Sequence, residues 1–416
     1  MKPSPRLPDR IADLAVFGGS RAFAEPLHVG RPNIGDRAAL LTRINDILDR
    51  RWFTNDGPVV QEFERRIAAH LGVKHCIAMC NATIALEIAT RAVGFKGEVI
   101  VPSFTFIATA HALQWQEITP VFCDIDPRTH NLDPSQIERL ITPRTTGILP
   151  VHVWGRPCDV EAIAALAAKH RLRVIYDACH AFGATHGGRL IGGFGDAEVF
   201  SFHATKFLNS FEGGAVATND DDLAKKMRLM RNFGFAGYDR VIYPGTNGKM
   251  TEIAAAMGVT SLESIDTFIA VNRRHYETYR RELARLPGVS VIRYDEAEKN
   301  NFQYIILEIE PRLAGLTRDQ LVRVLHAENI LCRRYFYPGC HRLEPYASYF
   351  PNAHLLLPET ERLVTRVMSL PNGTGIADEQ VATVCALIRF CCEHGAEIAA
   401  RLPADGSSHA TDRPTA

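Results

Sequence analysis

Short apolar runs alternate with stretches of helical periodicity between about residues 75 and 218. The runs are rich in Val, Ile and Phe and have the length of buried strands. Seven of them can be recognised, at 75–79, 98–104, 120–126, 147–153, 173–178, 198–202 and 214–218. Amphipathic stretches lie between them, for example over 84–93 and 160–170. Apolar strands separated by helices predict one large α/β domain with a mostly parallel sheet covered on both faces.

A further amphipathic helix is predicted over 59–71, before the first strand. Its apolar face carries Val60, Phe63, Ile67 and Leu71. The face predicted to meet water carries Glu62, Glu64, Arg65 and Arg66.

After Asp220 the pattern changes to long helices, followed by a smaller α+β segment. The helices are predicted over 221–231, 251–270 and 272–286; the later segment has a strand over 303–310 and helices over 318–328 and 378–392. The predicted division is an N-terminal arm (1–16), a large α/β domain (17–265), a small α+β domain (266–402) and a disordered tail (403–416), which is rich in Ser, Thr, Pro and Asp.

Composition narrows the classes of function. The 416 residues include 47 Lys and Arg and 47 Asp and Glu, so no net positive charge is available to attract nucleic acid or an anionic membrane. No apolar run is long enough to span a bilayer or to form a signal peptide, and a cytoplasmic protein is expected. The ten cysteines contain no CxxC pair, so we interpret them as mostly buried, reduced residues and expect no metal site.

Three predicted strand–loop junctions carry polar residues that could do chemistry. Asp177 ends one strand and is followed by His180, while Ser201 ends another and is followed by Lys206. Asn81 and Thr83 stand where a strand leads into a helix. Reactive groups collect at such strand ends in open α/β sheets.

Each of these residues also has a structural interpretation. Asn81 or Thr83 can cap a helix, Asp177 can be a cap or a metal ligand, and His180 can be a core histidine. A single lysine is usually a solvated charge. Lys206 differs because the surrounding sequence FSFHATKFLN is aromatic and apolar, and a desolvated lysine has the lowered pKa that Schiff-base chemistry needs.

Taken together, these residues predict a pyridoxal phosphate site. A helix start can bind the phosphate, an acid can keep the pyridine nitrogen protonated, and a buried lysine can bind the cofactor covalently. No GxxxxGK[ST] motif is present, and no Rossmann glycine motif stands between a strand and a helix. The sequence GGRLIGGFGD (187–196) is interpreted as a hairpin.

These stretches resemble the DegT/DnrJ/StrS family of nucleotide-sugar aminotransferases. The resemblance extends over about 17–387 and is carried by FTNDGPVVQEFE (53–64), CNATIALEIA (80–89), GEVIVPSFTFIATAHAL (97–113), DACHAFGA (177–184), GDAEVFSFHATKFLNSFEGG (195–214), RNFG (231–234) and GTNGKMTEIAAAMG (245–258). It implies the aspartate-aminotransferase (type I) fold, a large domain with a mostly parallel seven-stranded sheet plus a small C-terminal domain. Within the family, FGGSRAF, VGRPN, SFHATK and YFYPGCHRLEPY are most similar to dTDP-4-keto-6-deoxyglucose 4-aminotransferases of antibiotic-sugar pathways.

The resemblance implies a role for each matching residue. Lys206 would form the Schiff base with pyridoxal phosphate and Asp177 would pair with its pyridine nitrogen. His180, where many relatives have Gln, would lie near the ring hydroxyl, and Phe106 would stack on the ring.

The phosphate would be bound by Ala82, Thr83 and Ser201. Asn247 would reach it from the partner subunit, which implies a homodimer with shared active sites. Lys249 replaces a common Arg, so its contact with a carboxylate or sugar phosphate is less well defined.

The implied reaction is transamination with L-glutamate as the amino donor and a nucleotide-linked 4-keto-6-deoxyhexose as the acceptor. Three alternatives stay open: a 3-keto sugar, a 4-ketopentose, and a non-catalytic binding protein on the same scaffold. Basic residues around 228–240 and 333–342, among them Arg333, Arg334 and His341, could contact the nucleotide diphosphate or form an ordinary surface cluster.

Overall fold

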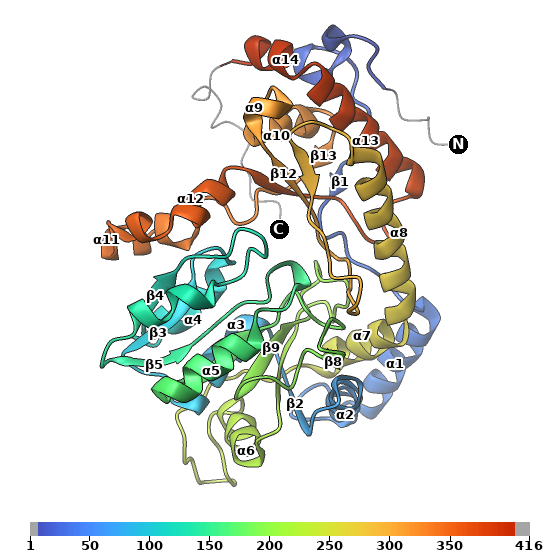
Figure 1. Cartoon of the computed structure of the whole chain (residues 1–416). Coiled ribbons are helices and arrows are strands. Elements are labelled where there is room, and N and C mark those ends of the chain that lie inside the picture. The colour runs from blue at the N-terminus through green and yellow to red at the C-terminus, as the bar shows by residue number, and fades with distance from the viewer. Residues whose placement is uncertain (1–6, 404–416) are drawn as a thin grey trace.

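The computed structural model describes residues 7–403 and is organised around a seven-stranded sheet (Figure 1). The strands are β2 (His75–Met79), β3 (Glu98–Pro102), β4 (Thr119–Cys123), β5 (Thr145–Ile148), β6 (Arg173–Asp177), β9 (Ala197–Ser201) and β10 (Gly214–Thr218). Their order is β2-β10-β9-β6-β5-β3-β4. β10 is antiparallel to both neighbours, and the other pairs are parallel. The prediction of seven strands in a mostly parallel sheet is confirmed.

Helices cover both faces of this sheet, which explains why its strands are apolar throughout. Alternate residues along a strand point to opposite faces, so Ile77 packs with α3 (Ala82–Val93), α4 (Ile107–Gln114) and α6 (Asp221–Met230). Its neighbour Ala78 packs in a separate core with α2 (Pro58–Leu71) and α7 (Glu252–Glu263). A further core forms against α5 (Val160–His170), which also lies on this second face.

Local signals set the ends of these helices. α2 begins with Pro58 after Gly57 and ends at Gly72, which has a left-handed φ of 69°. The Asn81 side chain caps α3 by accepting a hydrogen bond from the Ile84 N–H at 2.9 Å. Asp159 caps α5 in the same way, accepting from Ala162 at 3.0 Å.

The small domain is built on an antiparallel sheet of β11 (Val289–Val291), β12 (Ile305–Ile309) and β14 (Val367–Leu370). Its helices are α8 (Ile265–Leu283), α10 (Arg318–Ala327) and α13 (Asp378–Glu393). N-terminal residues pack in the same core, among them Leu14, Phe23 and Leu27, and β1 (Leu27–His28) pairs in parallel with β13 (Ile330–Leu331). The predicted domain limits stay a prediction, but these contacts associate residues 11–28 with the small domain. The predicted tail lies outside the described residues except for Pro403.

The remaining helices are α1 (Arg37–Arg50), α9 (Pro311–Ala314), α11 (Tyr346–Tyr349), α12 (Pro358–Val364) and α14 (Gly395–Arg401). The 3-10 turns are at Ile11–Asp13, Ala15–Phe17, Pro134–Gln136, Glu138–Leu140, Val153–Gly155, Cys340–Arg342 and Ala353–Leu356. The glycine-rich segment forms the expected hairpin, with β7 (Thr185–His186) antiparallel to β8 (Arg189–Leu190). The break between the two long helices falls at Ser264 instead of about residue 271.

The prediction that Glu64 faces water is wrong. Glu64 is buried in α2 and forms ion pairs with Arg228 and Arg231. It also accepts a hydrogen bond from the Ala78 N–H at 2.9 Å. A buried carboxylate needs such partners, and here they come from α6 and from the residue that follows it. These two arginines are therefore engaged in the fold, which leaves them less suited to the nucleotide role considered for 228–240.

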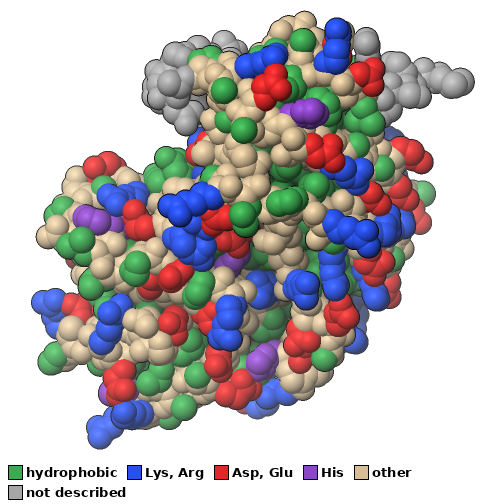
Figure 2. Space-filling view, turned by 45° about the horizontal axis from the view of Figure 1, so that its top comes forward, with side chains coloured by type: hydrophobic (Ala, Val, Ile, Leu, Met, Phe, Trp, Pro, Cys, Tyr) green, Lys and Arg blue, Asp and Glu red, His purple; other side chains and the backbone are tan. Residues whose placement is uncertain are grey.

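The surface carries both signs of charge, and Figure 2 shows acidic and basic side chains interspersed over one face. Seven of the ten cysteines are buried and all are free, as the composition predicts. Within residues 7–403, no single helix is long and apolar enough to cross a membrane; α7 and α8 meet that criterion only when taken together across a 62° bend. In the same residues, no cluster of His, Cys, Asp and Glu is arranged to hold a metal ion.

Candidate active site

A cavity of about 550 Å³ opens where β6 and β9 end and α3 begins. It brings together eight of the predicted site residues: Ala82, Thr83, Phe106, Asp177, His180, Ser201, Lys206 and Arg333. They come from sequence positions far apart, but the carboxyl ends of parallel strands meet at one edge of the sheet. Asp177 and Lys206, the two residues on which the sequence interpretation depends most, thus line the same cavity.

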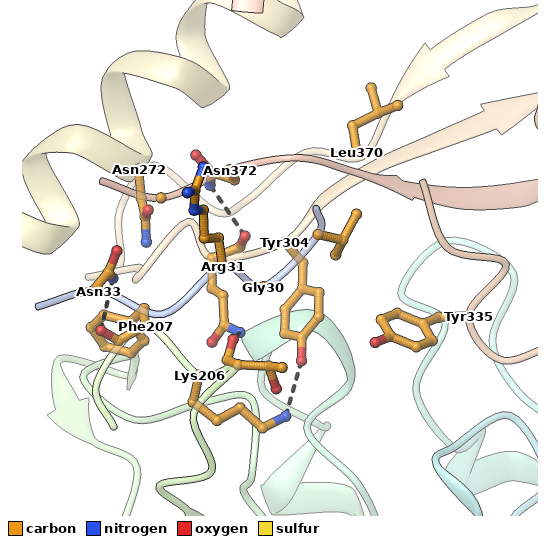
Figure 3. Close-up of a pocket in the computed structure, with 14 residues that line it drawn as sticks. Gly30, Arg31, Asn33, Lys206, Phe207, Asn272, Tyr304, Tyr335, Leu370 and Asn372 are labelled. Atoms are coloured by element: carbon orange, nitrogen blue, oxygen red, sulfur yellow. Dashed lines mark hydrogen bonds between the residues drawn. The ribbon is translucent and has the colours of Figure 1, made fainter. Parts of the chain in front are cut away.

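Lys206 lies in the loop after β9, and its amine is held by a tyrosine. Nζ lies 3.0 Å from the Tyr304 hydroxyl, and the two groups point toward each other in Figure 3. The surrounding protein removes water from the amine, which lowers the pKa of Lys206. A lowered pKa increases the neutral, nucleophilic fraction of the amine.

Asp177, at the end of β6, is buried and fixed by two hydrogen bonds. One carboxylate oxygen accepts from the Thr109 hydroxyl at 2.8 Å, and the other from the Cys179 N–H at 3.1 Å. The Thr109 hydroxyl is in turn 2.9 Å from that of Thr105. These two donors, from α4 and from the residues after β6, fix the orientation of the carboxyl group at the cavity.

His180 lies in an aromatic stack with one nitrogen already engaged. Its ring is nearly parallel to those of Trp154 and Phe336, at centroid distances of 6.0 and 5.8 Å. Nδ1 accepts the Trp154 backbone N–H at 3.2 Å. Burial lowers the pKa of His180 well below its ordinary value, so the ring is neutral and carries its proton on Nε2. It can therefore donate one hydrogen bond to an oxygen.

The start of α3 is the candidate anion site. Asn81 satisfies the Ile84 N–H, whereas the helix itself has no partner for the N–H groups of Ala82 and Thr83. Ser201 adds its hydroxyl from the end of β9. Gly214 lets this helix start approach β10 closely, because a Cβ there would lie 2.5 Å from the Asn81 carbonyl carbon. Free N–H groups and the helix dipole attract a phosphate.

Three predicted residues are absent from the lining of this cavity. Asn247 is exposed on the surface of the chain. The Lys249 amine donates to Asn232 at 3.0 Å and lies 4.8 Å from the centre of the Phe233 ring. His341 is buried, with Nδ1 2.6 Å from the Ser103 hydroxyl and Nε2 2.5 Å from Glu361.

The residues considered for binding the substrate differ in whether they line the cavity. His341 has a structural set of partners, and the Arg334 guanidinium, also outside the lining, is paired with Asp319 at 3.2 Å. Arg333 does line the cavity. Asn247 is exposed, and its role toward a partner subunit stays a prediction.

Sequence reasoning missed several residues of the site. Tyr304, Thr109, Trp154, His203 and Glu212 all line the cavity or bond to a residue that does. Thr109 could have been found, because it lies three residues from Phe106 at the start of a helix, next to the predicted site. Tyr304 carries no such signal, since an aromatic residue before a strand usually belongs to the core.

The residues present fit pyridoxal phosphate. A fixed carboxylate, an amine of lowered pKa, a neutral imidazole donor and a helix N-terminus surround one cavity, and these match the nitrogen, aldehyde, hydroxyl and phosphate of that cofactor. Asp177, Lys206, His180 and the start of α3 would hold these groups respectively.

Fold and site together define a pyridoxal-phosphate-dependent aminotransferase of fold type I. The model of the DegT/DnrJ/EryC1/StrS aminotransferase family matches residues 36–389, and the chain belongs to this family. The fold and family expected from the sequence are thereby confirmed.

Individual relatives cover nearly the whole chain. A dTDP-4-amino-4,6-dideoxy-D-glucose transaminase of Shigella dysenteriae is 37% identical, over 88% of this chain and 99% of the relative. A GDP-perosamine synthase of Caulobacter vibrioides is 40% identical, over 82% and 92%. The crystal structure of DesI in the presence of its TDP-sugar product superposes with a TM-score of 0.91 at 51% identity, covering 94% of this chain and 99% of DesI.

Proposed function

We propose that this enzyme transfers the amino group of L-glutamate to the 4-keto group of a dTDP-linked 4-keto-6-deoxyhexose. The product is the 4-amino-4,6-dideoxy sugar. The observation that carries the chemistry is the single cavity lined by Lys206 and Asp177. The similarity to DesI, solved in the presence of its TDP-sugar product and 51% identical over nearly the full length, supports the nucleotide. The similarity to two dTDP-4-amino-4,6-dideoxy-D-glucose transaminases, 37% and 35% identical, supports the position on the sugar.

The roles of the residues follow from their contacts. Pyridoxal phosphate, when bound, withdraws electrons from the carbon next to the amino nitrogen and makes its hydrogen acidic. Asp177 would keep the ring nitrogen protonated, and the N–H of His180 Nε2 would donate to the ring oxygen. The start of α3 would bind the phosphate.

Lys206 would move the proton in both half-reactions. Its neutral amine would be the base that removes the hydrogen from the donor's α-carbon, and the resulting ammonium would be an acid able to give up that proton again. With the keto sugar Lys206 would take up and release a proton in the reverse direction. The lowered pKa of Lys206 supports this role, because both protonation states are then accessible closer to neutral pH.

A homodimer with shared sites is part of the proposal. A surface segment next to Asn247 exposes a group of large apolar side chains, which is typical of an interface: Phe233, Phe235, Tyr238, Val241 and Ile242. Asn247, which is exposed just after this segment, would bind the phosphate of the pyridoxal phosphate held by the partner subunit.

The decisive experiment offers 3-keto and 4-keto sugars, linked to dTDP or GDP, together with L-glutamate and identifies the aminated product. We expect amination of the dTDP-linked 4-keto-6-deoxyhexose. Lys206→Ala should give no product, whereas Lys96→Ala, which removes an exposed lysine outside the cavity lining, should be fully active. Amination of 3-keto sugars alone would contradict the proposed position. No consumption of glutamate with any sugar would contradict the enzyme itself.

A further inference from the structure

Tyr304 brings a hydroxyl from the small domain to the catalytic lysine of the large domain. It immediately precedes β12, is buried, and lies 3.0 Å from Lys206 Nζ. Its ring is held by His180 at 4.5 Å and by Trp154 at 5.4 Å between centroids. Its backbone carbonyl accepts a hydrogen bond from the Tyr294 hydroxyl at 2.9 Å. The position of the phenol oxygen is therefore set by packing on several sides.

Tyr304 lines two neighbouring cavities. The site cavity and a smaller one beside it share four lining residues, namely Thr205, Lys206, Tyr304 and Tyr335. Figure 3 shows the smaller cavity, with Tyr304 standing between the Lys206 amine and the strands of the small domain. The free amine is thus held at the wall of the site cavity.

The Tyr304 phenol can form a hydrogen bond with the Lys206 amine in both of its protonation states. The ammonium of Lys206 can donate to the phenol oxygen, and the neutral amine can accept the phenol hydrogen. Burial raises the pKa of Tyr304 well above its ordinary value, so the phenol keeps its proton and does not compete as a base. The contact can persist while Lys206 changes its charge.

We propose that Tyr304 is a positioning residue for the proton transfers of Lys206. It holds the freed amine at one place in both protonation states. This inference rests on the proposed transaminase function, in which the lysine acts only when its amine is free. The other titratable groups that act on the Lys206 amine or line the cavity with it are Asp177, Cys179, His180, His203, Glu212, Arg333 and Tyr335.

The first test measures how fast Lys206 of the cofactor-free enzyme captures added pyridoxal phosphate. Borohydride traps the product at short times, and mass spectrometry quantifies the Lys206 adduct over a series of pH values. The reactive form is the neutral amine. A hydrogen bond from an ammonium is stronger than one from a neutral amine, so the phenol favours the ammonium. Tyr304→Phe should therefore shift the midpoint of the rate profile downward by about one pH unit.

Tyr276→Phe is the matched control. Tyr276 is buried in the same domain, and its hydroxyl donates to the Ile292 carbonyl at 3.2 Å without lining either cavity. It should leave the midpoint unchanged. An unchanged midpoint in Tyr304→Phe, or an equal shift in Tyr276→Phe, would overturn the proposal.

Two further measurements keep the result interpretable. If Tyr304→Phe does not fold, 3,5-difluorotyrosine at position 304, a weaker hydrogen-bond acceptor, should shift the midpoint in the same direction by a smaller amount, and no shift would overturn the proposal. In the loaded enzyme, kcat should fall about tenfold while KM for the keto sugar changes less than about twofold. The capture assay uses no sugar, so a wrong sugar assignment does not affect it.

Discussion

At the scale of single residues, the site depends on protein groups that set the protonation of their neighbours. Thr109 and the Cys179 N–H donate hydrogen bonds to the Asp177 carboxyl group, while burial lowers the pKa values of Lys206 and His180 and so favours their neutral forms. The cavity thereby holds a carboxyl group, fixed by two donors, beside two nitrogen groups whose neutral forms are favoured by burial. This combination suits a cofactor with a cationic ring nitrogen and an electrophilic carbon.

Thr109→Val tests the support of Asp177. Valine has nearly the same shape but cannot donate, so the buried carboxylate loses one of its two hydrogen bonds. The Kd for pyridoxal phosphate should rise about tenfold or more, the effect of removing a hydrogen bond to a charged group. Absorbance titration of the cofactor-free enzyme measures it. Thr105→Val, which removes only the partner of Thr109, should have a smaller effect, and an equal Kd in Thr109→Val and the wild type would refute the role.

At the scale of elements, α3 shows how one local signal serves both stability and binding. Asn81 ends the loop after β2 and caps the helix by bonding the Ile84 N–H. The next two residues, Ala82 and Thr83, whose N–H groups this cap does not bond, line the cavity. Asp159 caps α5 with the same geometry, but α5 lies away from the cavity lining. The two caps therefore provide a matched pair.

Asn81→Ala and Asp159→Ala should each lower the free energy of unfolding by about 1 kcal/mol, the usual contribution of an N-cap. Only Asn81→Ala should also weaken binding of pyridoxal phosphate, because only α3 begins at the cavity. Urea unfolding and cofactor titration measure the two effects. Equal loss of cofactor affinity in both variants would show that the start of α3 is not the phosphate site.

At the scale of the whole molecule, contacts between distant segments place the site. Glu361 at α12 pairs with Arg342 at 2.8 Å and with His341, which reaches Ser103 after β3. The hydrogen bond from Arg342, together with His341, lowers the pKa of Glu361 to about 2. His341 thus connects α12 to the central sheet.

The contribution of Glu361 and its partners to the free energy of unfolding should depend on pH. The folded pKa of Glu361 is below its unfolded value of about 4.3, so its contribution is fully present above the unfolded pKa and is lost as the pH falls toward 2. Wild type should exceed Glu361→Gln in the free energy of unfolding by a constant amount above about pH 5, and the difference should shrink below it. Urea unfolding between pH 3 and 7 checks this. A pH-independent difference would contradict the assignment.

Shared active sites predict complementation between inactive chains. Lys206→Ala lacks the catalytic amine, and Asn247→Ala lacks the residue proposed to reach the partner's phosphate. A mixed dimer should contain one site with both residues intact, so mixing and reassembling the two variants should restore up to about a quarter of the wild-type activity, for random pairing. Activity no higher than that of Asn247→Ala alone would contradict sharing.

The outline of the large domain could be predicted because its signals are local. The seven strands, the cap at Asn81 and the glycine hairpin each depend on residues near one another in sequence. The position of Asp177 and Lys206 at one cavity could be predicted because strand ends meet at one edge of a parallel sheet. These inferences need alternation and spacing, and no long-range pairing.

The errors and omissions involve distant partners. Glu64 looks like a solvent-facing residue on its helix, but its two arginines lie 164 and 167 residues away. Tyr304 looks like a core aromatic residue, and its contact with Lys206 spans 98 residues. His341 looks like a nucleotide ligand, whereas its bond to Ser103 spans 238.

The order of apolar and polar residues by itself determined the central sheet and the start of α3, and it made Lys206 and Asp177 the candidates for the site, since burial and capping are decided within a few residues. Which charges are neutralised, which hydroxyl faces the lysine and which histidine is structural was decided only by the tertiary structure. The physical reason is that hydrogen bonds and ion pairs act over a few ångströms in space, and only the packed chain shows which groups come within that distance.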